Sequence, residues 1–313
     1  PFDLVDGLPV GISFISTAWD DKSIIEMAYA FEQETKFNEF YPPPSESKKE
    51  QDLQKMLASS RPIDIGKSLW TDELTWMEVR DLIETGYTQV IIPTGGIEQN
   101  GPFLSTGKHN VILEAACPEI AKKLGNTLCA PIIKFVPEGD IEPPSGAMLF
   151  PGSISLRAET YNMLLDDIAS SLKQAGFKHI IFLGDSGGNQ TGMEIVSGKL
   201  NQRWTGSGVL VNYIPQYYNP GWEETERFTK EVLGVEETSN DGHHDDIWVT
   251  AMMMVTDPEQ VRYQQRIDAG LATINGVDIS SIDETIDLGN KMLEFRAEFT
   301  AEAIRKVIQS SKH

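Results

Sequence analysis

An apolar run that leads directly into a glycine-rich turn constrains the fold of this chain most. Thr88-Gln89-Val90-Ile91-Ile92 reads as a buried β-strand. Residues 93–109 follow it at once and carry a carboxylate, a carboxamide and an imidazole among their glycines. In open α/β sheets, ligands bind at the edge where the carboxyl ends of the strands lie. The stretch therefore predicts an α/β fold with a functional site at the end of this strand.

Strand and helix patterns alternate along the rest of the chain. Apolar runs predict further strands at 128–135, 179–183 and 208–213. The near-continuous apolar character of 179–183 is typical of a parallel strand covered on both faces. Predicted helices lie at 71–82, 109–124, 157–176, 188–204, 246–255 and 284–309. This alternation predicts a layered α/β domain.

The charge of the chain excludes some classes of partner. The 313 residues carry a formal net charge of −21, which repels phosphate backbones, so we expect no nucleic-acid binding. We also expect no membrane attachment, because no apolar run approaches the roughly 20 residues of a membrane span. With no visible signal peptide, we expect a cytoplasmic location. Two cysteines, Cys117 and Cys129, do not make a disulfide framework and are expected to be buried.

Residues 1–43 read as a separate piece. Residues 7–15 predict a turn and a strand, and Asp20 could cap a helix with apolar positions Ile24, Ile25, Ala28 and Phe31. The segment resembles the C-terminal end of amidase-signature enzymes, whose serine and lysine machinery lies upstream and is not part of this segment. It could be the end of an amidase fusion, or only a docking strand and helix. Residues 44–66 predict an exposed linker with a short polar helix, and 67–313 the main domain.

Three motifs of the main domain resemble those of the creatininase family of metal-dependent amidohydrolases. The first lies in residues 93–109, where the family has T-G-[ST]-x-E-Q-H-G-P-H-L-P-x-G-T-D and binds metal through the glutamate, the first histidine and the final aspartate. Glu98 keeps its place, Asn100 replaces the histidine and His109 replaces the aspartate. Neutral asparagine is a poor zinc ligand, so the resemblance implies a one-metal site, with Glu98 and His109 as ligands.

The second motif is Gly184-Asp185-Ser186-Gly187-Gly188-Asn189, directly after a predicted strand. The family commonly has N-G-H-G-G-N here, so Ser186 stands at the position of a histidine ligand and Asp185 could supply a carboxylate instead. The same residues match the nucleophile elbow G-x-S-x-G, which leaves a serine hydrolase open, with an acid from Asp241 or Asp245 and a histidine from His243 or His244. Backbone amides of this turn could hold an oxyanion.

The third motif is Asp241-Gly242-His243-His244-Asp245-Asp246, ahead of a predicted helix. The family has H-A-G-x-x-E-T here, and its histidine, matched by His243, transfers a proton to the leaving nitrogen. Imidazole beside carboxylate also suits general acid–base catalysis on chemical grounds. We therefore expect catalytic roles for His243, His244 and Asp246.

The loop at 137–153 offers further candidates. Phe150-Pro151-Gly152-Ser153 resembles the family's F-P-G-T, but Ala147 stands where the family has a histidine. Glu138 and Glu142 could line a substrate pocket, and Trp222 and Trp248 could wall it. The residues expected to contact substrate are Asn100, Ser186, Asn189 and Glu142.

The resemblance covers about residues 70–260. It implies a three-layer α/β/α domain with a mostly parallel sheet, assembly as a hexamer, and hydrolysis of a C–N bond in a small or cyclic amide. It also implies zinc or manganese, with one ion per chain favoured over two, held by Glu98, His109 and Asp185. Two alternatives stay open: a serine hydrolase that uses Ser186, and a non-catalytic family member that binds a ligand or scaffolds a partner.

Overall fold

The computed structural model describes residues 21–35, 48–240 and 242–310, and the chain divides into two units, 1–62 and 63–313. In the first unit, α1 (Asp21–Thr35) carries the predicted amphipathic helix. α3 (Lys48–Leu57) lies within the predicted linker. The strand expected at 7–15 and the cap expected from Asp20 lie outside the described residues.

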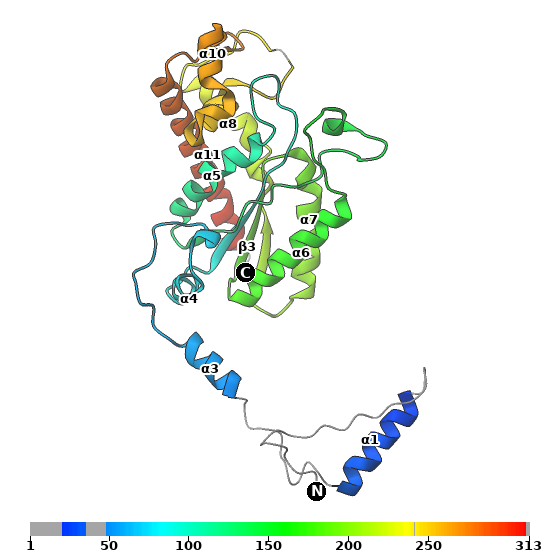
Figure 1. Ribbon diagram of the computed structural model, residues 1–313. Coiled ribbons are helices and arrows are strands. Elements are labelled where there is room, and N and C mark those ends of the chain that lie inside the picture. The colour runs from blue at the N-terminus through cyan, green and yellow to red at the C-terminus, as the bar shows by residue number, and fades with distance from the viewer. Residues whose placement is uncertain (1–20, 36–47, 241, 311–313) are drawn as a thin grey trace. The chain divides into compact units, whose positions relative to one another are not determined.

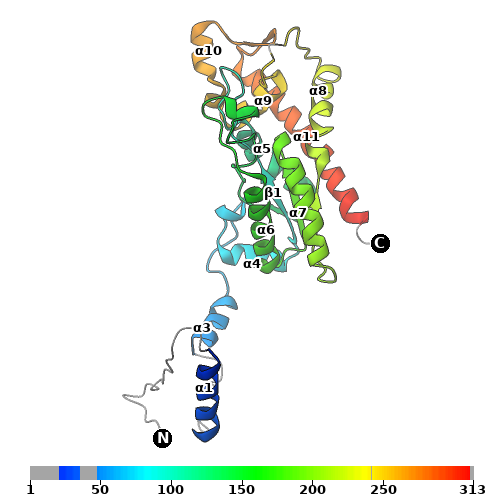
Figure 2. The ribbon, with the colours of Figure 1, turned by 90° about the vertical axis from the view of Figure 1, so that its right-hand side faces the viewer.

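A parallel sheet forms the centre of the second unit. Its strands, in order across the sheet, are β2 (Thr127–Cys129), β1 (Gln89–Thr94), β3 (His179–Gly184) and β4 (Leu210–Tyr213). Helices cover both faces, as Figure 1 and Figure 2 show. The helices on one face are α6 (Ala158–Ala175) and α7 (Gln190–Arg203), and those on the other are α5 (Lys108–Leu124) and α11 (Ile282–Ser310). The predicted α/β fold with a parallel sheet between helical layers is confirmed.

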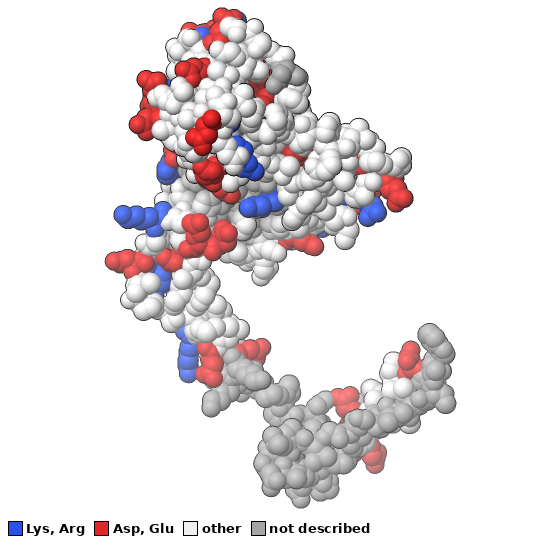
Figure 3. Space-filling view, turned by 45° about the horizontal axis from the view of Figure 1, so that its top comes forward, with Lys and Arg blue, Asp and Glu red and all other residues white. Residues whose placement is uncertain are grey.

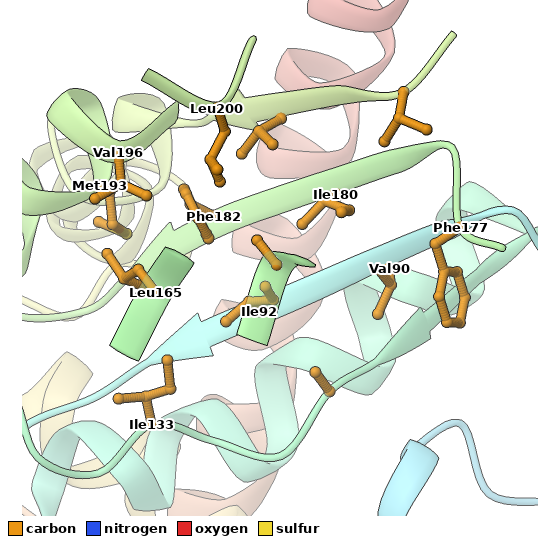
Figure 4. Close-up of a cluster of buried hydrophobic side chains, with 14 of the residues drawn as sticks. Val90, Ile92, Ile133, Leu165, Phe177, Ile180, Phe182, Met193, Val196 and Leu200 are labelled. Atoms are coloured by element: carbon orange, nitrogen blue, oxygen red, sulfur yellow. The ribbon is translucent and has the colours of Figure 1, made fainter. Parts of the chain in front are cut away.

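Alternate residues of the two central strands explain why both faces of the sheet are covered. Successive side chains of a strand point to opposite faces. Val90 and Ile92 of β1 pack against α6 and α7, in the cluster shown in Figure 4. Ile91, between them, packs against α5 and α11. The apolar runs read in the sequence therefore fill two separate cores.

Strand β2 is shorter than the run 128–135 from which it was predicted. Pro131 has no backbone N–H and interrupts the ladder. The chain still follows β1, because Ala130 and Ile133 donate backbone hydrogen bonds to Ile91 and Pro93. The expected strand is thus a short strand followed by an irregular segment with the same course.

The remaining elements complete the second unit. The helix predicted at 71–82 is a short 3₁₀ turn, Thr71–Glu73, followed by α4 (Trp76–Glu84), which begins at a capping box of Thr75 and Glu78. α9 (Ile247–Thr256) packs against α5 and α11. The elements not predicted are α8 (Gly221–Glu231), α10 (Tyr263–Ala269) and the hairpin of β5 (Thr273–Ile274) and β6 (Val277–Asp278).

Among the described helices, none combines the length and the apolar character that crossing a membrane requires. The acidic excess of the chain is visible on the face in Figure 3, where carboxylates lie at several places with lysine and arginine between them. Both predicted buried cysteines, Cys117 and Cys129, are buried as free thiols in the core between the sheet, α5 and α11.

Candidate functional site

A cavity of about 1100 Å³ lies in the second unit and is lined by residues 137–142, the turns that follow β1 and β3, and the start of α5 and α9. Many of its lining side chains are titratable or aromatic. They are Glu98, Lys108, His109, Glu138, Asp140, Glu142, Arg157, Glu159, Asp185, His244, Asp246, Tyr218, Trp222 and Trp248. The cavity therefore has the composition expected of a site for acid–base chemistry on a small molecule.

His109 joins two carboxylates at the floor of this cavity. Its Nε2 lies 2.8 Å from Oε1 of Glu98, and its Nδ1 lies 2.8 Å from Oδ2 of Asp185. Burial lowers the pKa of His109, as does the charge of Lys108, but the two carboxylate contacts outweigh both and raise it. An ionised carboxylate only accepts hydrogen bonds, so His109 donates from both nitrogens as an imidazolium.

Asp185, the more deeply buried of the two carboxylates, contacts a second cation besides His109. The side chain is fully buried, and its other oxygen accepts a hydrogen bond of 3.0 Å from Arg296. Burial opposes ionisation of Asp185, but Arg296 and then His109 hold its pKa below the usual value. The Arg296 guanidinium is itself fixed between aromatic rings, with its carbon 3.4 Å from the ring centre of Trp222 and 4.0 Å from that of Tyr217.

Lys108 places a second cation beside Glu98. It is only 4% exposed, and its Nζ lies 3.7 Å from Oε1 of Glu98 and donates to the carbonyl of His244 at 3.3 Å. Burial lowers the pKa of Lys108, against the charge of Glu98. Burial also opposes ionisation of Glu98, but the hydrogen bond with His109 and the nearby imidazole of His244 hold its pKa well below the usual value.

Glu138 is a third carboxylate of this cavity, and its pKa is raised where those of Glu98 and Asp185 are lowered. Its Oε2 accepts a hydrogen bond of 3.0 Å from Ser186, and its Oε1 has no hydrogen-bond partner among the described residues. Burial, and then the charge of Glu98, raise the pKa of Glu138 to about 7. Glu98 and Glu138 therefore share a cavity with their pKa values pushed apart, the pattern that assigns acid and base roles to paired carboxylates.

Two glycines allow Glu138 to reach this position. A Cβ on Gly96 would lie 2.0 Å from Oε1 of Glu138, and a Cβ on Gly188 would lie 1.7 Å from the carbonyl oxygen of Pro137. A side chain at Gly96 would displace the carboxylate of Glu138, and a side chain at Gly188 would push the backbone of the loop at 137–142 away. The glycines of both motifs are thus needed for the approach of Glu138.

Glu138→Gln is expected to stabilise the folded chain more at pH 8.5 than at pH 5.5. A carboxyl group whose pKa rises from 4.5 to about 7 on folding holds its proton more tightly when folded, so the free energy of unfolding falls as the pH rises through this window. The variant should gain about 2 kcal/mol relative to wild type between the two pH values. Urea denaturation measures this, with Glu142→Gln as the control on the same loop. An equal effect at both pH values would contradict a raised pKa.

The two asparagines expected to contact substrate lie outside the cavity lining and hydrogen-bond to backbone carbonyls of the turns around it. Asn100 and Asn189 are buried, at 1% and 0% exposure, and neither lines the cavity. Asn100 donates to the carbonyls of Glu98 and Ser105. Asn189 donates to the carbonyls of Thr94 and Gly95. Both side chains fit a role in holding the turns after β1 and β3.

The third motif contributes His244 and Asp246 to the cavity wall, whereas His243 lies outside it. Nδ1 of His244 lies 3.6 Å from Oε1 of Glu98. Asp246 is the N-cap residue of α9, and burial, followed by the charge of Asp245, raises its pKa. The His243 side chain packs against the backbone of Gly101, since a Cβ added to Gly101 would lie 3.0 Å from the Cβ and Cγ of His243. His244 is therefore better placed for proton transfer than His243.

Ser186 is 3% exposed, and its Oγ donates to Glu138. His243 and His244 were the histidines considered for a triad, but the side-chain partner of Ser186 among the described residues is Glu138. Asp241, one of the acids considered for a triad, lies outside the described residues. Glu142 lies exposed at the cavity and remains a predicted substrate contact.

Lys108 and Arg296 were missed in the sequence, and Glu138 was considered only as a pocket residue. Lys108 had a visible signal, since it is a charged residue next to His109 in the first motif. Arg296 had none, because it lies 111 residues beyond Asp185 in a long amphipathic helix.

Comparisons with known proteins agree with this architecture. The family model of creatininase, described as creatinine amidohydrolase, matches residues 72–292. Creatinine amidohydrolase of Pseudomonas putida is 23% identical over 229 residues, which are 70% of this chain and 84% of that protein. A short match, 50% identical over 42 residues, links 13% of the chain to 9% of the A-type subunit of glutamyl-tRNA(Gln) amidotransferase from Latilactobacillus sakei subsp. sakei (strain 23K). This match confirms the amidase resemblance.

Solved structures show the same fold. A crystal structure of creatininase is 19% identical with a TM-score of 0.55, over 77% of this chain and 98% of that one. Another structure, described as the manganese form, has a TM-score of 0.55 at 20% identity with the same coverage. A mutant described as a Zn-Zn type has a TM-score of 0.56 at 19% identity, again with that coverage. Because the family model spans most of the second unit, the chain belongs to the creatininase family.

Proposed function

We propose that this chain is a hydrolase that cleaves the C–N bond of a small amide in the cavity, with Glu138 as the general base. The observation that carries the proposal is the pair of carboxylates at the cavity floor, of which Glu98 stays ionised and Glu138 titrates near pH 7. A base is most effective when its pKa lies near the working pH. Family membership supports the reaction class, since the curated relative is named a creatinine amidohydrolase.

The reaction would follow from the placement of the side chains. Glu138 takes a proton from a water molecule as that water attacks the amide carbonyl carbon. The buried ammonium of Lys108 stabilises the negative charge that develops on the carbonyl oxygen. Glu138 then returns the proton to the leaving nitrogen, so the products are a carboxylic acid and an amine. Trp222 and Trp248, with ring centres 4.4 Å apart, supply an apolar wall for the substrate.

The zinc or manganese ion predicted at Glu98, His109 and Asp185 is not given a step in this reaction. The donors do not fit an ion, because Glu98 and Asp185 lie on opposite sides of the His109 ring and occupy both of its nitrogens. Within the described ranges, no group of three or more histidine, cysteine or acidic side chains could hold a metal. The bound ion stays a prediction, and a measurement of metal content tests it. The hexamer also stays a prediction, and a measurement of molecular mass in solution tests it.

A screen of small linear and cyclic amides tests the proposal. Wild-type protein is incubated with each amide, and mass spectrometry follows the release of carboxylic acid and amine. Glu138→Gln, purified in the same way, controls for contaminating amidohydrolases. Turnover by wild type and not by the variant is expected. Binding of an amide without turnover would favour the non-catalytic alternative and contradict the proposal.

The serine hydrolase alternative has less support. A serine nucleophile needs a base that takes its proton, and in this site the Ser186 hydroxyl faces a carboxylate rather than an imidazole. The hydroxyl also accepts the backbone N–H of Gly188 at 3.4 Å. These contacts fit a serine that orients Glu138. Labelling of Ser186 by a fluorophosphonate would reverse this assignment.

A further inference from the structure

Two buried carboxylates of the cavity, Glu98 and Asp185, each face two side-chain cations. Glu98 faces the Nε2 of His109 at 2.8 Å and the ammonium of Lys108 at 3.7 Å. Asp185 faces the Nδ1 of His109 at 2.8 Å and the guanidinium of Arg296 at 3.0 Å. The result is a continuous row of alternating charge from Lys108 to Arg296.

This row of charges compensates buried carboxylates, as a bound cation does in a metal site. Asp185 is fully buried, and the side chain of Glu98 is 14% exposed, so neither carboxylate is stable there without an opposite charge. A divalent cation supplies that charge where carboxylates converge on it. Here the positive charges come from the protein chain itself.

The same contacts leave no place for an ion on His109. Each ring nitrogen of His109 lies 2.8 Å from a carboxylate oxygen, Nε2 from Glu98 and Nδ1 from Asp185, so a carboxylate occupies the place that an ion on either nitrogen would need. An ion on Glu98 would also stand beside the buried ammonium of Lys108, which is 3.7 Å from the nearer carboxylate oxygen. Repulsion between two cations in a poorly solvated site is costly.

We propose that Lys108 and Arg296, joined through His109, replace the divalent metal of the family in this chain, so that the pocket is assembled without one. The inference deepens the proposed hydrolase function and rests on it for the reaction. Metal content and Tm test this inference without any substrate. The inference can therefore prove wrong while the hydrolase proposal holds, and the reverse.

The first arm of the test is metal content. The wild-type chain is purified without chelator, and inductively coupled plasma mass spectrometry measures zinc, manganese, iron, cobalt and nickel per chain. We expect far less than one ion per chain, and no change in Tm when EDTA, zinc or manganese is added. One or more ions per chain, or a rise in Tm with added zinc or manganese, would overturn the proposal.

The second arm removes one cation. Lys108→Met leaves Glu98 with less compensation and is expected to lower Tm by about 6 °C or more. Glu98→Gln in the same background should recover part of that loss, because the uncompensated charge is then gone. Lys108→Arg keeps the charge and should stay closer to wild type. If Lys108→Met leaves Tm unchanged, Lys108 does not stand in for an ion and the proposal is wrong.

Discussion

Replacing Arg296 with methionine is expected to lower the free energy of unfolding by about 3 to 5 kcal/mol. The variant would leave Asp185 fully buried, with His109 as its remaining cationic contact. Methionine keeps much of the apolar contact with Trp222, so the loss reports mainly on charge. Folded domains are typically stable by only about 5 to 15 kcal/mol, so this single change removes a large part of the total. Urea denaturation followed by circular dichroism measures it.

Two further variants show whether charge is the cause. Arg305→Met, on the same helix, removes a half-exposed arginine that pairs with Glu298 and is expected to cost about 1 kcal/mol or less. Arg296→Met combined with Asp185→Asn should recover part of the loss, since no buried charge is left alone. If Arg296→Met costs no more than Arg305→Met, Asp185 does not depend on Arg296.

The central part of the fold could be predicted because strands buried on both faces appear in the sequence as continuous apolar runs. The apolar runs at β1 and β3 are buried on both faces, and Gly176 ends α6 in the left-handed conformation, with φ of 115°. α8 was missed for an identifiable reason. Its buried positions include Gly221, Thr225 and Thr229, which a search for apolar periodicity does not count. The apolar residues of α8, Trp222 and Phe228, are only partly buried, and the short pattern that they form was overlooked.

The candidate site was predicted as a set of residues but not as an arrangement. Glu98, His109 and Asp185 were expected to lie together, and the structure places them in contact. Their roles depend on which way each ring nitrogen points and on Arg296, a residue distant in sequence. A carboxylate and an imidazole read the same in a sequence whether they bind an ion or pair with each other. Metal binding and ion pairing were thus not distinguishable from the sequence alone.

The position of Glu138 was harder to predict, because its character comes from its surroundings. Gly188 allows the backbone of the loop to approach, Gly96 leaves room for the carboxylate of Glu138, and burial then raises the pKa of Glu138. An acidic residue in a loop rich in proline and glycine is otherwise read as exposed. The same loop keeps Glu142 exposed, so the two glutamates differ only in their contacts.

Glu138→Gln is expected to lower kcat about 100- to 10,000-fold on the amide that the screen identifies. Glutamine has nearly the same shape and can still accept the hydrogen bond of Ser186, but it cannot take a proton from water. In wild type, kcat/KM should rise with pH and level off above about pH 7, as Glu138 loses its proton. Steady-state kinetics between pH 5.5 and 8.5 measures both effects. A variant that keeps both the rate and this pH dependence would remove Glu138 from the mechanism.

Ser186→Ala separates the two enzymatic mechanisms. If Ser186 only orients Glu138, the variant loses one charge-assisted hydrogen bond, and kcat should fall by about tenfold to a hundredfold. If Ser186 is the nucleophile, alanine removes the group that forms the covalent intermediate, and the loss should equal or exceed that of Glu138→Gln. In that second case Glu138 would be the base that takes the proton of the serine hydroxyl. Its pKa of about 7 would then give kcat/KM the same dependence on pH, although the first step would be attack by serine rather than by water.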